Sequence, residues 1–312
     1  MRIVSLGSGS SGNALLVEAG PTRVLVDAGF PPATLRARLR QVGVLPHTLT
    51  AILLTHEHHD HARGAMELAG RHAVPLIANG RTLDEVRRAS PLPTGIPVPA
   101  QHDLAVGEST QIGGLLVSSF PVSHDAVAPC GYMLSSGAWR VCVAIDTGEV
   151  TAPMAEALQA AHLLVLEANH DEERLLGGPY PWHLKRRIRS ATGHLSNAQA
   201  AAALVAALDD GPRWVWLAHL SRTNNTPDLA RATVRAHLRQ MGLAHARVMV
   251  APPGPGPVWD SATIWSDSLQ PPADARPTMM DQLPHTGRIV PTAVSPALGA
   301  GDADHAEAPS ER

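Results

Sequence analysis

The stretch His-Glu-His-His-Asp-His at residues 56–61 decides how this chain is interpreted. Read as His-x-His-x-Asp-His, it offers three imidazoles and one carboxylate within a single tight turn. It follows an apolar run at residues 51–55 that is typical of a buried strand. Ligands at a strand end are held by rigid backbone, as a metal site requires. Four candidate ligands exceed what one ion with an open coordination position needs from one segment, so the motif predicts two metal ions.

Three more apolar strands end on a residue that can bind a metal. Residues 117–123 lead into His124, residues 141–145 into Asp146, and residues 214–218 into His219. Such placement is what a site at one edge of packed sheets requires. The candidate ligand set is therefore His56, His58, Asp60, His61, His124, Asp146 and His219.

The set divides between two ions. One would be held by His56, His58 and His124. The other would be held by Asp60, His61 and His219, with Asp146 bridging the two ions through its two oxygens. A water shared by two cations is largely ionised at neutral pH, so a bridging hydroxide would be the nucleophile.

The chain has 17 histidines, so a solitary one is expected to be an ordinary core or surface residue. The cluster at 56–61 differs, because burying that many imidazoles without a metal would leave several ring nitrogens without a partner. The single residues His124, Asp146 and His219 gain support from their positions at strand ends.

Composition excludes several classes of protein. With 44% hydrophobic residues, the 312-residue chain can build a substantial core. A net charge of −3 gives no global attraction to nucleic acid, and 3% aromatic residues argue against a broad base-stacking platform. Two cysteines do not make a disulfide framework. Without a signal peptide pattern or a membrane-spanning apolar run, a cytoplasmic protein is expected.

Strand and helix patterns alternate in both halves of the chain, which indicates a two-sheet α/β sandwich. Apolar strands are expected at 3–6, 14–18, 23–27, 51–55, 115–120, 132–134, 140–146, 163–167, 214–218 and 247–250. Helices are expected at 33–41, 61–70, 82–89, 151–161, 196–208 and 227–241. We expect one domain over residues 1–258 and a Pro/Ala-rich, mostly disordered tail over 259–312.

These motifs resemble the metallo-β-lactamase fold, over roughly residues 1 to 255. The 56–61 motif, His124, Asp146 and His219 match that superfamily's ligand motifs in order. The resemblance implies an αββα four-layer sandwich and a metal-dependent hydrolase. It also implies that Asp27, which closes the strand at 23–27, orients a ligand rather than binding metal. Thioesterases, lactonases and nucleases all share this motif, so the substrate stays open at this point.

Further segments resemble one branch, the YycJ/WalJ-type group, which are bacterial proteins regarded as DNA exonucleases. These segments are the Gly/Ser loop at 7–13 and the polar stretches at 166–171, 192–197 and 218–227. The Gly-His-Leu-Ser at 193–196 also resembles a phosphate-contacting histidine motif of ribonuclease J- and ribonuclease Z-like enzymes. Two departures are His59, where a small polar residue is commoner, and the tail after residue 260.

A helix expected to start at Ser196 would direct free N–H groups at a phosphate oxygen, together with Asn197. His194 could donate to that phosphate or protonate the leaving oxygen. Lys185 and Arg187 belong to a basic run at 183–189, which concentrates positive charge nearby or forms an ordinary solvated helix face. We further assign Asp60 a catalytic role, and Asn169 a role in supporting a ligand.

The sequence thus predicts a dinuclear metal-dependent phosphodiesterase acting on nucleic acid, most simply a DNA exonuclease. The alternative is a small-molecule hydrolase such as a glyoxalase II-like thioesterase or a lactonase. A third reading, a scaffold with structural metals, fits poorly with a ligand set that leaves coordination positions open. Nitrogen and oxygen ligands favour Zn²⁺, with Mn²⁺ or Fe²⁺ open. Polarity of cleavage, DNA versus RNA, oligomeric state and protein partners stay undetermined.

Overall fold

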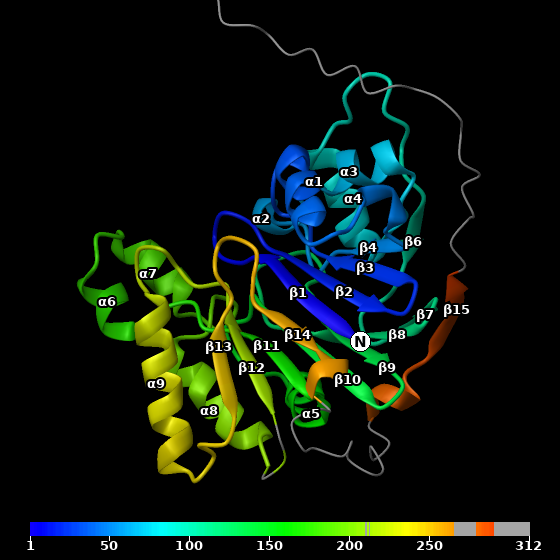
Figure 1. The fold of residues 1–312 in the computed structure, drawn as a ribbon. Coiled ribbons are helices and arrows are strands. Elements are labelled where there is room, and N and C mark those ends of the chain that lie inside the picture. The colour runs from blue at the N-terminus through cyan, green and yellow to red at the C-terminus, as the bar shows by residue number, and fades with distance from the viewer. Residues whose placement is uncertain (210, 212, 265–278, 290–312) are drawn as a thin grey trace, which may run out of the picture.

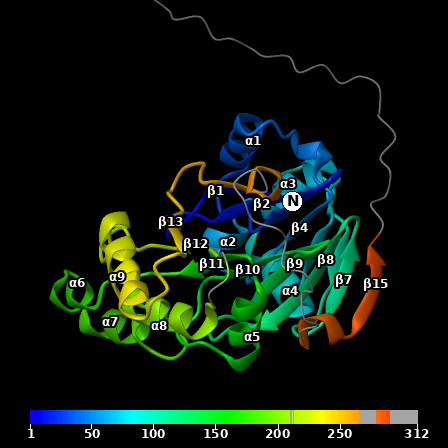
Figure 2. The ribbon, with the colours of Figure 1, turned by 60° about the horizontal axis from the view of Figure 1, so that its bottom comes forward.

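The computed structural model describes residues 1–209, 211, 213–264 and 279–289. Two mixed β-sheets pack face to face, and helices cover the outer face of each, as Figures 1 and 2 show. This is the αββα four-layer arrangement expected from the sequence. No helix in the described ranges has the length and apolar character that crossing a membrane would require.

The N-terminal sheet has the strand order β14-β1-β2-β3-β4-β5-β6. From β1 to β3 the strands are antiparallel, and from β3 to β6 they are parallel. The strands are β1 Arg2–Gly7, β2 Ala14–Ala19, β3 Thr22–Val26, β4 Ala51–Leu53, β5 Leu76–Ala78, β6 Gln101–Asp103 and β14 Val258–Asp260.

The second sheet has the order β13-β12-β11-β10-β9-β8-β7-β15, with β10 to β13 parallel. Its strands are β7 Ser109–Ile112, β8 Leu115–Pro121, β9 Cys130–Ser136, β10 Trp139–Ala144, β11 Leu163–Glu167, β12 Trp214–Ala218, β13 Arg247–Val250 and β15 His285–Ile289. The parallel strands β10, β11 and β12 end at the same edge, where Asp146 and His219 follow.

Helices occupy both outer layers. On the N-terminal sheet lie α1 Pro32–Gln41, α2 His59–Ala62, α3 Ala65–His72 and α4 Gly80–Ala89. Against the second sheet lie α5 Ala152–Ala160, α8 Asn197–Ala207 and α9 Pro227–Gln240, while α6 Glu172–Gly177 and α7 Trp182–Ile188 project beyond its edge. The remaining helical segments are Pro46–Thr48, α10 Ser261–Ile264 and Met279–Gln282.

The core forms three apolar layers. The central one lies between the sheets and includes Val17, Tyr132 and Trp216. In β2, Leu15 and Val17 point into this layer whereas Leu16 points to the helices outside, so the strand is apolar on both faces. A sheet covered on both faces needs such continuous apolar strands, which is why the sequence shows runs rather than alternation.

All ten expected strands are present, and the expected helix at 61–70 divides into α2 and α3. Short or partly polar strands escaped prediction, namely β5, β6, β7, β14 and β15. The helices α6 and α7 were also missed. Each has seven residues or fewer, which is too short for a helical period to stand out.

The boundary expected at residue 258 falls inside β14, which pairs antiparallel with β1. Trp259 on this strand is buried between the sheets, and β15 pairs in parallel with β7. Segments 259–264 and 279–289 therefore form part of the fold, in contrast to the disordered tail expected there. The three residues of β14 are too few to show the alternation from which a strand is predicted, so the sequence did not indicate that this segment belongs to the fold. Residues 265–278 and 290–312 of the expected tail lie outside the described residues.

Candidate metal centre

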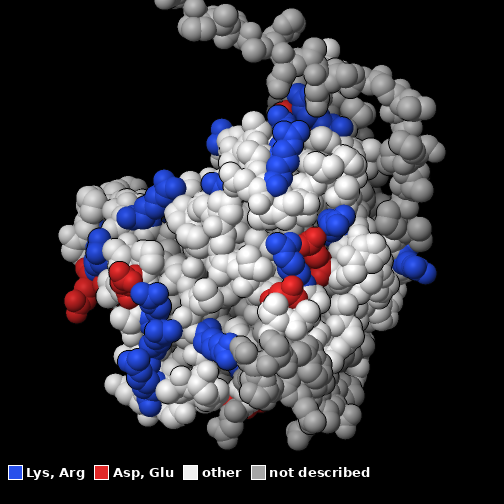
Figure 3. Space-filling view, viewed as in Figure 1, with Lys and Arg blue, Asp and Glu red and all other residues white. Residues whose placement is uncertain are grey.

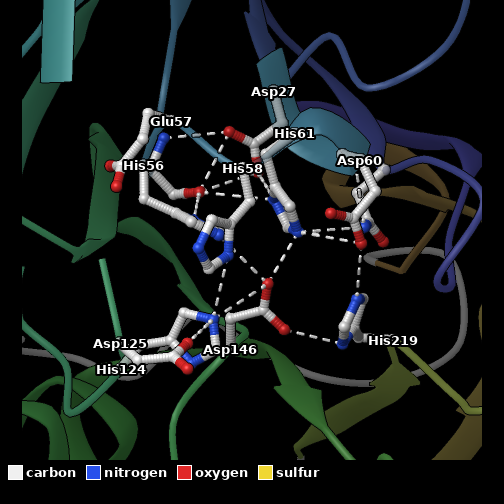
Figure 4. Close-up of polar contacts among 12 residues, drawn as sticks. Asp27, His56, Glu57, His58, Asp60, His61, His124, Asp125, Asp146 and His219 are labelled. Carbon is white, nitrogen blue, oxygen red and sulfur yellow. Dashed lines mark hydrogen bonds and ion pairs between the residues drawn. The ribbon is translucent and has the colours of Figure 1, made fainter. Parts of the chain in front are cut away.

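The strand ends bring all seven candidate ligands together, as Figure 4 shows. One group consists of His56, His58 and His124, and a second consists of Asp60, His61, Asp146 and His219. Within each group the candidate ligand atoms lie within 4.8 Å of one another. These two groups contain the seven expected residues, with Asp146 in the second group. A third group that meets the same criterion consists of Asp146, Glu167, His194 and His219.

The three imidazoles of the first group come from two segments. His56 and His58 follow β4, and His124 follows β8. The ring of His56 lies 4.7 Å from that of His58 and 5.2 Å from that of His124 between centroids. Nε2 of His124 lies 3.3 Å from Nδ1 of His58. Three ring nitrogens thus face a common point.

Asp146 lies between the two groups (Figure 4). Its Oδ2 is 2.7 Å from Nε2 of His61 and 3.3 Å from Nε2 of His56. Its Oδ1 is 2.7 Å from Nδ1 of His219. One carboxylate therefore reaches imidazoles of both groups, which is the position that a bridging ligand needs.

Backbone strain marks the same strand ends. Asp27, Asp146 and His219 have φ angles of 60°, 55° and 55°, in the left-handed region that non-glycine residues rarely adopt. Each comes directly after, or two residues after, a strand. Strain of this kind costs about 1–3 kcal/mol per residue and persists where the surroundings hold it. Asp146 and His219 thereby contact each other, and Asp27 contacts His61.

Several imidazoles are oriented by a partner on the ring nitrogen that faces away from the other ligands. Nδ1 of His61 lies 2.8 Å from Asp27 Oδ2, and Nδ1 of His124 lies 3.1 Å from the carbonyl of Gly193. Asp27 also accepts hydrogen bonds from the amide and hydroxyl of Thr55. Such partners fix the ring tautomer of metal-binding histidines. Asp27 thus has the orienting position expected from the resemblance.

Glu167 is a further buried residue of the site, and the sequence reasoning gave it no role. Its Oε1 lies 2.8 Å from Nδ1 of His194 and 3.0 Å from Nδ1 of His219. The side chain is fully buried at the end of β11. Its position at the end of an apolar strand is the signal that singled out Asp146 and His219, so the same rule could have found it.

Charge in the metal-free site is unevenly distributed. Burial and the neighbouring His61 lower the pKa of His56 to about 4. Burial also opposes charge on His61, but Asp146, Asp27 and Asp60 outweigh it and raise its pKa to about 10. For His194, Glu167 and Asp146 outweigh burial and raise the pKa to about 9. In the metal-free site the carboxylates therefore keep His61 and His194 protonated, and His61 must lose its proton before it can bind a cation.

The donor set fits divalent cations. Nε2 of His56 and Oδ1 of Asp146 are buried and make no hydrogen bond of good geometry among the described residues, although each has an ion-pair contact within the site. Buried polar atoms without a hydrogen bond are rare, and a cation would satisfy both. The remaining donors are imidazole nitrogens and carboxylate oxygens, which suit zinc and neighbouring divalent metals.

His194 and Asn169 lie beside the ligands. The ring of His194 is 5.1 Å from that of His124 and 5.4 Å from that of His219. It is only partly buried, so it lies at the solvent side of the centre. Nδ2 of Asn169 donates to the carbonyl of His219 at 3.0 Å, which supports the strained turn there.

Three residues expected to contact phosphate, namely Lys185, Ser196 and Asn197, have their polar side-chain atoms engaged within the fold. Lys185 is buried, and its Nζ donates to the carbonyls of Leu176 and Gly178. Asn197 is buried and bonded to Asn225, and the hydroxyl of Ser196 caps α8. These side chains stabilise the local fold, so the expectation of direct phosphate contacts by them is corrected. Arg187 is exposed and bonds to Asp125 Oδ2 at 2.6 Å.

A family model described as a β-lactamase superfamily domain matches residues 22–220. The chain belongs to the metallo-β-lactamase superfamily. Exodeoxyribonuclease YycJ of Bacillus anthracis is 37% identical over 237 residues, 76% of this chain and 89% of that protein. Exodeoxyribonuclease WalJ of Streptococcus pneumoniae serotype 2 is 37% identical over 238 residues, 76% of this chain and 88% of that protein.

Among solved structures, the metallo-β-lactamase-fold protein YhfI of Bacillus subtilis aligns with a TM-score of 0.63 and 20% identity, covering 83% of this chain and 98% of that one. This likeness supports the fold. The expectations of the YycJ/WalJ-type group and of a metal-dependent hydrolase, made from the sequence, are confirmed by the superfamily match and the two relatives. The clustered histidines and aspartates support the use of divalent metal.

Proposed function

We propose that this metallo-β-lactamase-fold hydrolase is a two-metal phosphodiesterase that removes nucleotides from the ends of DNA. The observation that carries the proposal is the position of Asp146. Its carboxylate reaches His61 and His56 through one oxygen and His219 through the other, so the two ligand groups share one residue. A shared carboxylate is what two closely spaced cations need.

The seven ligand residues would hold the two ions, with His56, His58 and His124 around one and Asp60, His61 and His219 around the other. Zinc suits this mixture of imidazole and carboxylate best, with manganese and iron as alternatives. Such ions, when bound, lower the pKa of water and neutralise charge on a phosphoryl group. Oδ2 of Asp60 lies 3.2 Å from Nε2 of His219, so both side chains are placed to share one ion, and the catalytic role that we propose for Asp60 is to hold that ion at the reacting phosphate.

His194 is the candidate general acid, a role that side chains bound to a metal ion could not fill. Its Nδ1 donates to Glu167, so Nε2 on the opposite side of the ring is left to face a substrate. Because Glu167 and Asp146 raise its pKa, His194 is protonated at neutral pH in the metal-free protein. A protonated imidazole can donate to a phosphate oxygen and protonate the leaving oxygen. An amide at this position could donate a hydrogen bond but could not protonate the leaving oxygen.

Charge favours a phosphodiester over a neutral ester. Two divalent cations would bring four positive charges against three from the groups that would touch them directly, Asp60, Asp146 and a bound hydroxide, so the coordination sphere would attract an anion. DNA as the polymer comes from the YycJ and WalJ relatives, whose names describe exodeoxyribonucleases. Both cysteines are free and buried, in keeping with a reducing cytoplasm, where we place the enzyme.

The test uses metal-loaded protein with end-labelled single-stranded DNA, double-stranded DNA and RNA, beside a thioester and a lactone. We expect stepwise shortening of DNA from one end. The His58→Ala variant should lose this activity, since it removes a ligand from a half-exposed turn without opening the core. Hydrolysis of the thioester or lactone with all three polymers intact would refute the proposal. So would full nuclease activity in the His58→Ala protein.

A further inference from the structure

The helices α6 and α7 form a lobe, residues 171–193, between β11 and α8. Figures 1 and 2 both show it projecting beyond the sheets at the edge of the molecule. Five of its residues are lysine or arginine and three are acidic, whereas the whole chain carries a net charge of −3. The lobe is therefore a locally basic part of a weakly acidic protein.

One end of this lobe is bonded directly to the metal centre. The amide of His194 donates to the carbonyl of Ile188, the last residue of α7, and the carbonyl of Gly193 accepts from His124. Arg187 bonds to Asp125, whose Oδ1 lies 3.5 Å from Nε2 of His124. The seven residues of α7 span about 10 Å at 1.5 Å per residue. At 3.4 Å per nucleotide, the spacing along one strand of a duplex, the length of α7 corresponds to at most about three nucleotides.

The outward face of α7 carries an exposed tryptophan, Trp182. Trp182 is 58% exposed, and among the described residues it is the only Phe, Tyr or Trp that is more than about a third exposed. Arg186 follows one helical turn later and is also exposed, while Lys185 and Ile188 are buried on the opposite face. Residues four apart on a helix are neighbours on one side. Trp182 and Arg186 are therefore on the same exposed side of α7.

The other arginines of α7 have partners. Arg187 pairs with Asp125, and Arg189 pairs with Glu172. Arg186 makes no ion pair with a described residue, so its charge is available to a ligand. An exposed tryptophan next to an available arginine suits single-stranded nucleic acid, because bases stack on the ring and the arginine contacts the phosphate.

We propose that Trp182 and Arg186 form a binding surface for single-stranded DNA a few nucleotides from the scissile phosphate. The proposal rests on the proposed function and names the part of the substrate bound outside the metal centre. Trp182 stacks on one base of the strand, and Arg186 contacts its phosphate. The surface binds any sequence, since every base offers a face for stacking.

The helix α9 is the strongest competing surface. Its exposed face carries Arg231, Arg235 and Arg239 at four-residue spacing, and Figure 3 shows a column of blue side chains over this helix. This helix carries charge and the exposed imidazole of His237 but no Phe, Tyr or Trp, and Arg231 already pairs with Asp228. Arg239 on α9 therefore serves as a matched control for Arg186.

The test measures binding of a fluorescein-labelled, phosphorothioate-linked single-stranded oligonucleotide to the metal-loaded protein by fluorescence anisotropy. We expect Trp182→Ala to weaken binding about tenfold, within the range for loss of one stacked base, and Trp182→Phe to restore most of it. Arg186→Ala should weaken binding and lower the slope of log affinity against log salt by about 0.7, for one lost phosphate contact. Met249→Ala, another exposed apolar residue, and Arg239→Ala should bind as the wild type does.

Hydrolysis of bis(p-nitrophenyl) phosphate, a diester too small to reach α7, separates this surface from the metal centre. Trp182→Ala should hydrolyse it at the wild-type rate. Equal DNA binding by wild type and Trp182→Ala would overturn the inference and leave the proposed function standing. Loss of binding in Arg239→Ala with none in Arg186→Ala would overturn it in favour of α9. A wild-type protein that neither binds nor shortens DNA would overturn both the inference and the proposed function.

Discussion

Glu167 holds His194 through a 2.8 Å contact between Oε1 and Nδ1, and the same oxygen lies 3.0 Å from Nδ1 of His219. A single buried carboxylate thus orients one candidate ligand and one candidate proton donor. Its Oε2 accepts from the amides of Thr147 and Leu195, which anchors it to the loops after β10 and before α8. His194 and His219 are therefore both positioned by one residue.

Replacing Glu167 with Gln should lower DNA hydrolysis about 10- to 100-fold, because orienting partners of metal ligands have effects of this size. The amide keeps the shape but carries no charge to hold the proton on His194. Steady-state rates on end-labelled DNA and metal content would both be measured. Glu149→Gln, at an exposed position, is the control and should behave as wild type. A Glu167→Gln protein with unchanged rates would show that the carboxylate does not orient the site.

Replacing Asp27 should weaken metal binding, because Asp27 orients His61 and sits in the left-handed region at φ 60°. Asparagine adopts this conformation at a lower energetic cost than alanine, so Asp27→Asn tests the charge and Asp27→Ala also tests the strain. We expect Asp27→Asn to lose about 10- to 100-fold in metal affinity with little change in unfolding temperature. Asp27→Ala should also unfold at a lower temperature. Equal metal affinity in wild type and Asp27→Asn would contradict the orienting role.

Metal binding should release protons at pH 8. The pKa of His61 is raised to about 10 in the metal-free protein, so its imidazole is protonated there and must lose that proton to bind a cation. Metal affinity should therefore rise with pH up to about 10. Titration calorimetry in two buffers of different ionisation enthalpy would count the protons released. A binding enthalpy independent of the buffer would contradict this.

The raised pKa of His61 also makes the stability of the metal-free protein depend on pH. Because the folded pKa of His61 lies above the value of about 6.5 in the unfolded chain, its stabilising contribution is complete below pH 6.5. That contribution is lost as pH rises from 6.5 through about 10. Chelator-treated protein should therefore unfold more easily at pH 9 than at pH 7 in denaturant titrations, and metal-loaded protein should not show this loss. A metal-free protein equally stable at both values would contradict the assignment.

Replacing Trp259 should destabilise the whole domain. The indole is buried between the sheets and lies 5.3 Å from the ring of Trp139 between centroids. Loss of a buried large aromatic side chain costs about 3–5 kcal/mol. We expect Trp259→Ala to lower the free energy of unfolding by this amount in denaturant titrations, whereas Val258→Ala, exposed on the same strand, should change it little. Wild-type stability in Trp259→Ala would mean that β14 adds nothing to the fold.

The sequence predicted well which side chains would cluster, because each follows an apolar strand and is of a type that can bind metal. His124, Asp146 and His219 were single residues in separate segments, yet the parallel ends of neighbouring strands bring two of them to one edge. Glu167 also lies at the end of an apolar strand, β11, and the sequence reasoning overlooked it. The strained φ angles of Asp146 and His219 leave no trace in the sequence.

The residues expected to contact the substrate were predicted less well than the clustered histidines and aspartates. Lys185 and Arg186 are adjacent in a basic run, and only the turn of α7 decides which faces solvent. A seven-residue helix gives too little periodicity to make that choice from sequence. The strands β14 and β15 were missed for a related reason, since their pairing partners lie more than 150 residues away in the chain.

The presence of two metal ions is the central claim, and metal-anomalous crystallography of the loaded protein tests it most directly. We expect two anomalous peaks a few ångströms apart, one among His56, His58 and His124 and one among Asp60, His61 and His219, with Asp146 contacting both. Elemental analysis of the same sample should give two ions per chain. A single peak, or peaks away from these side chains, would contradict the account.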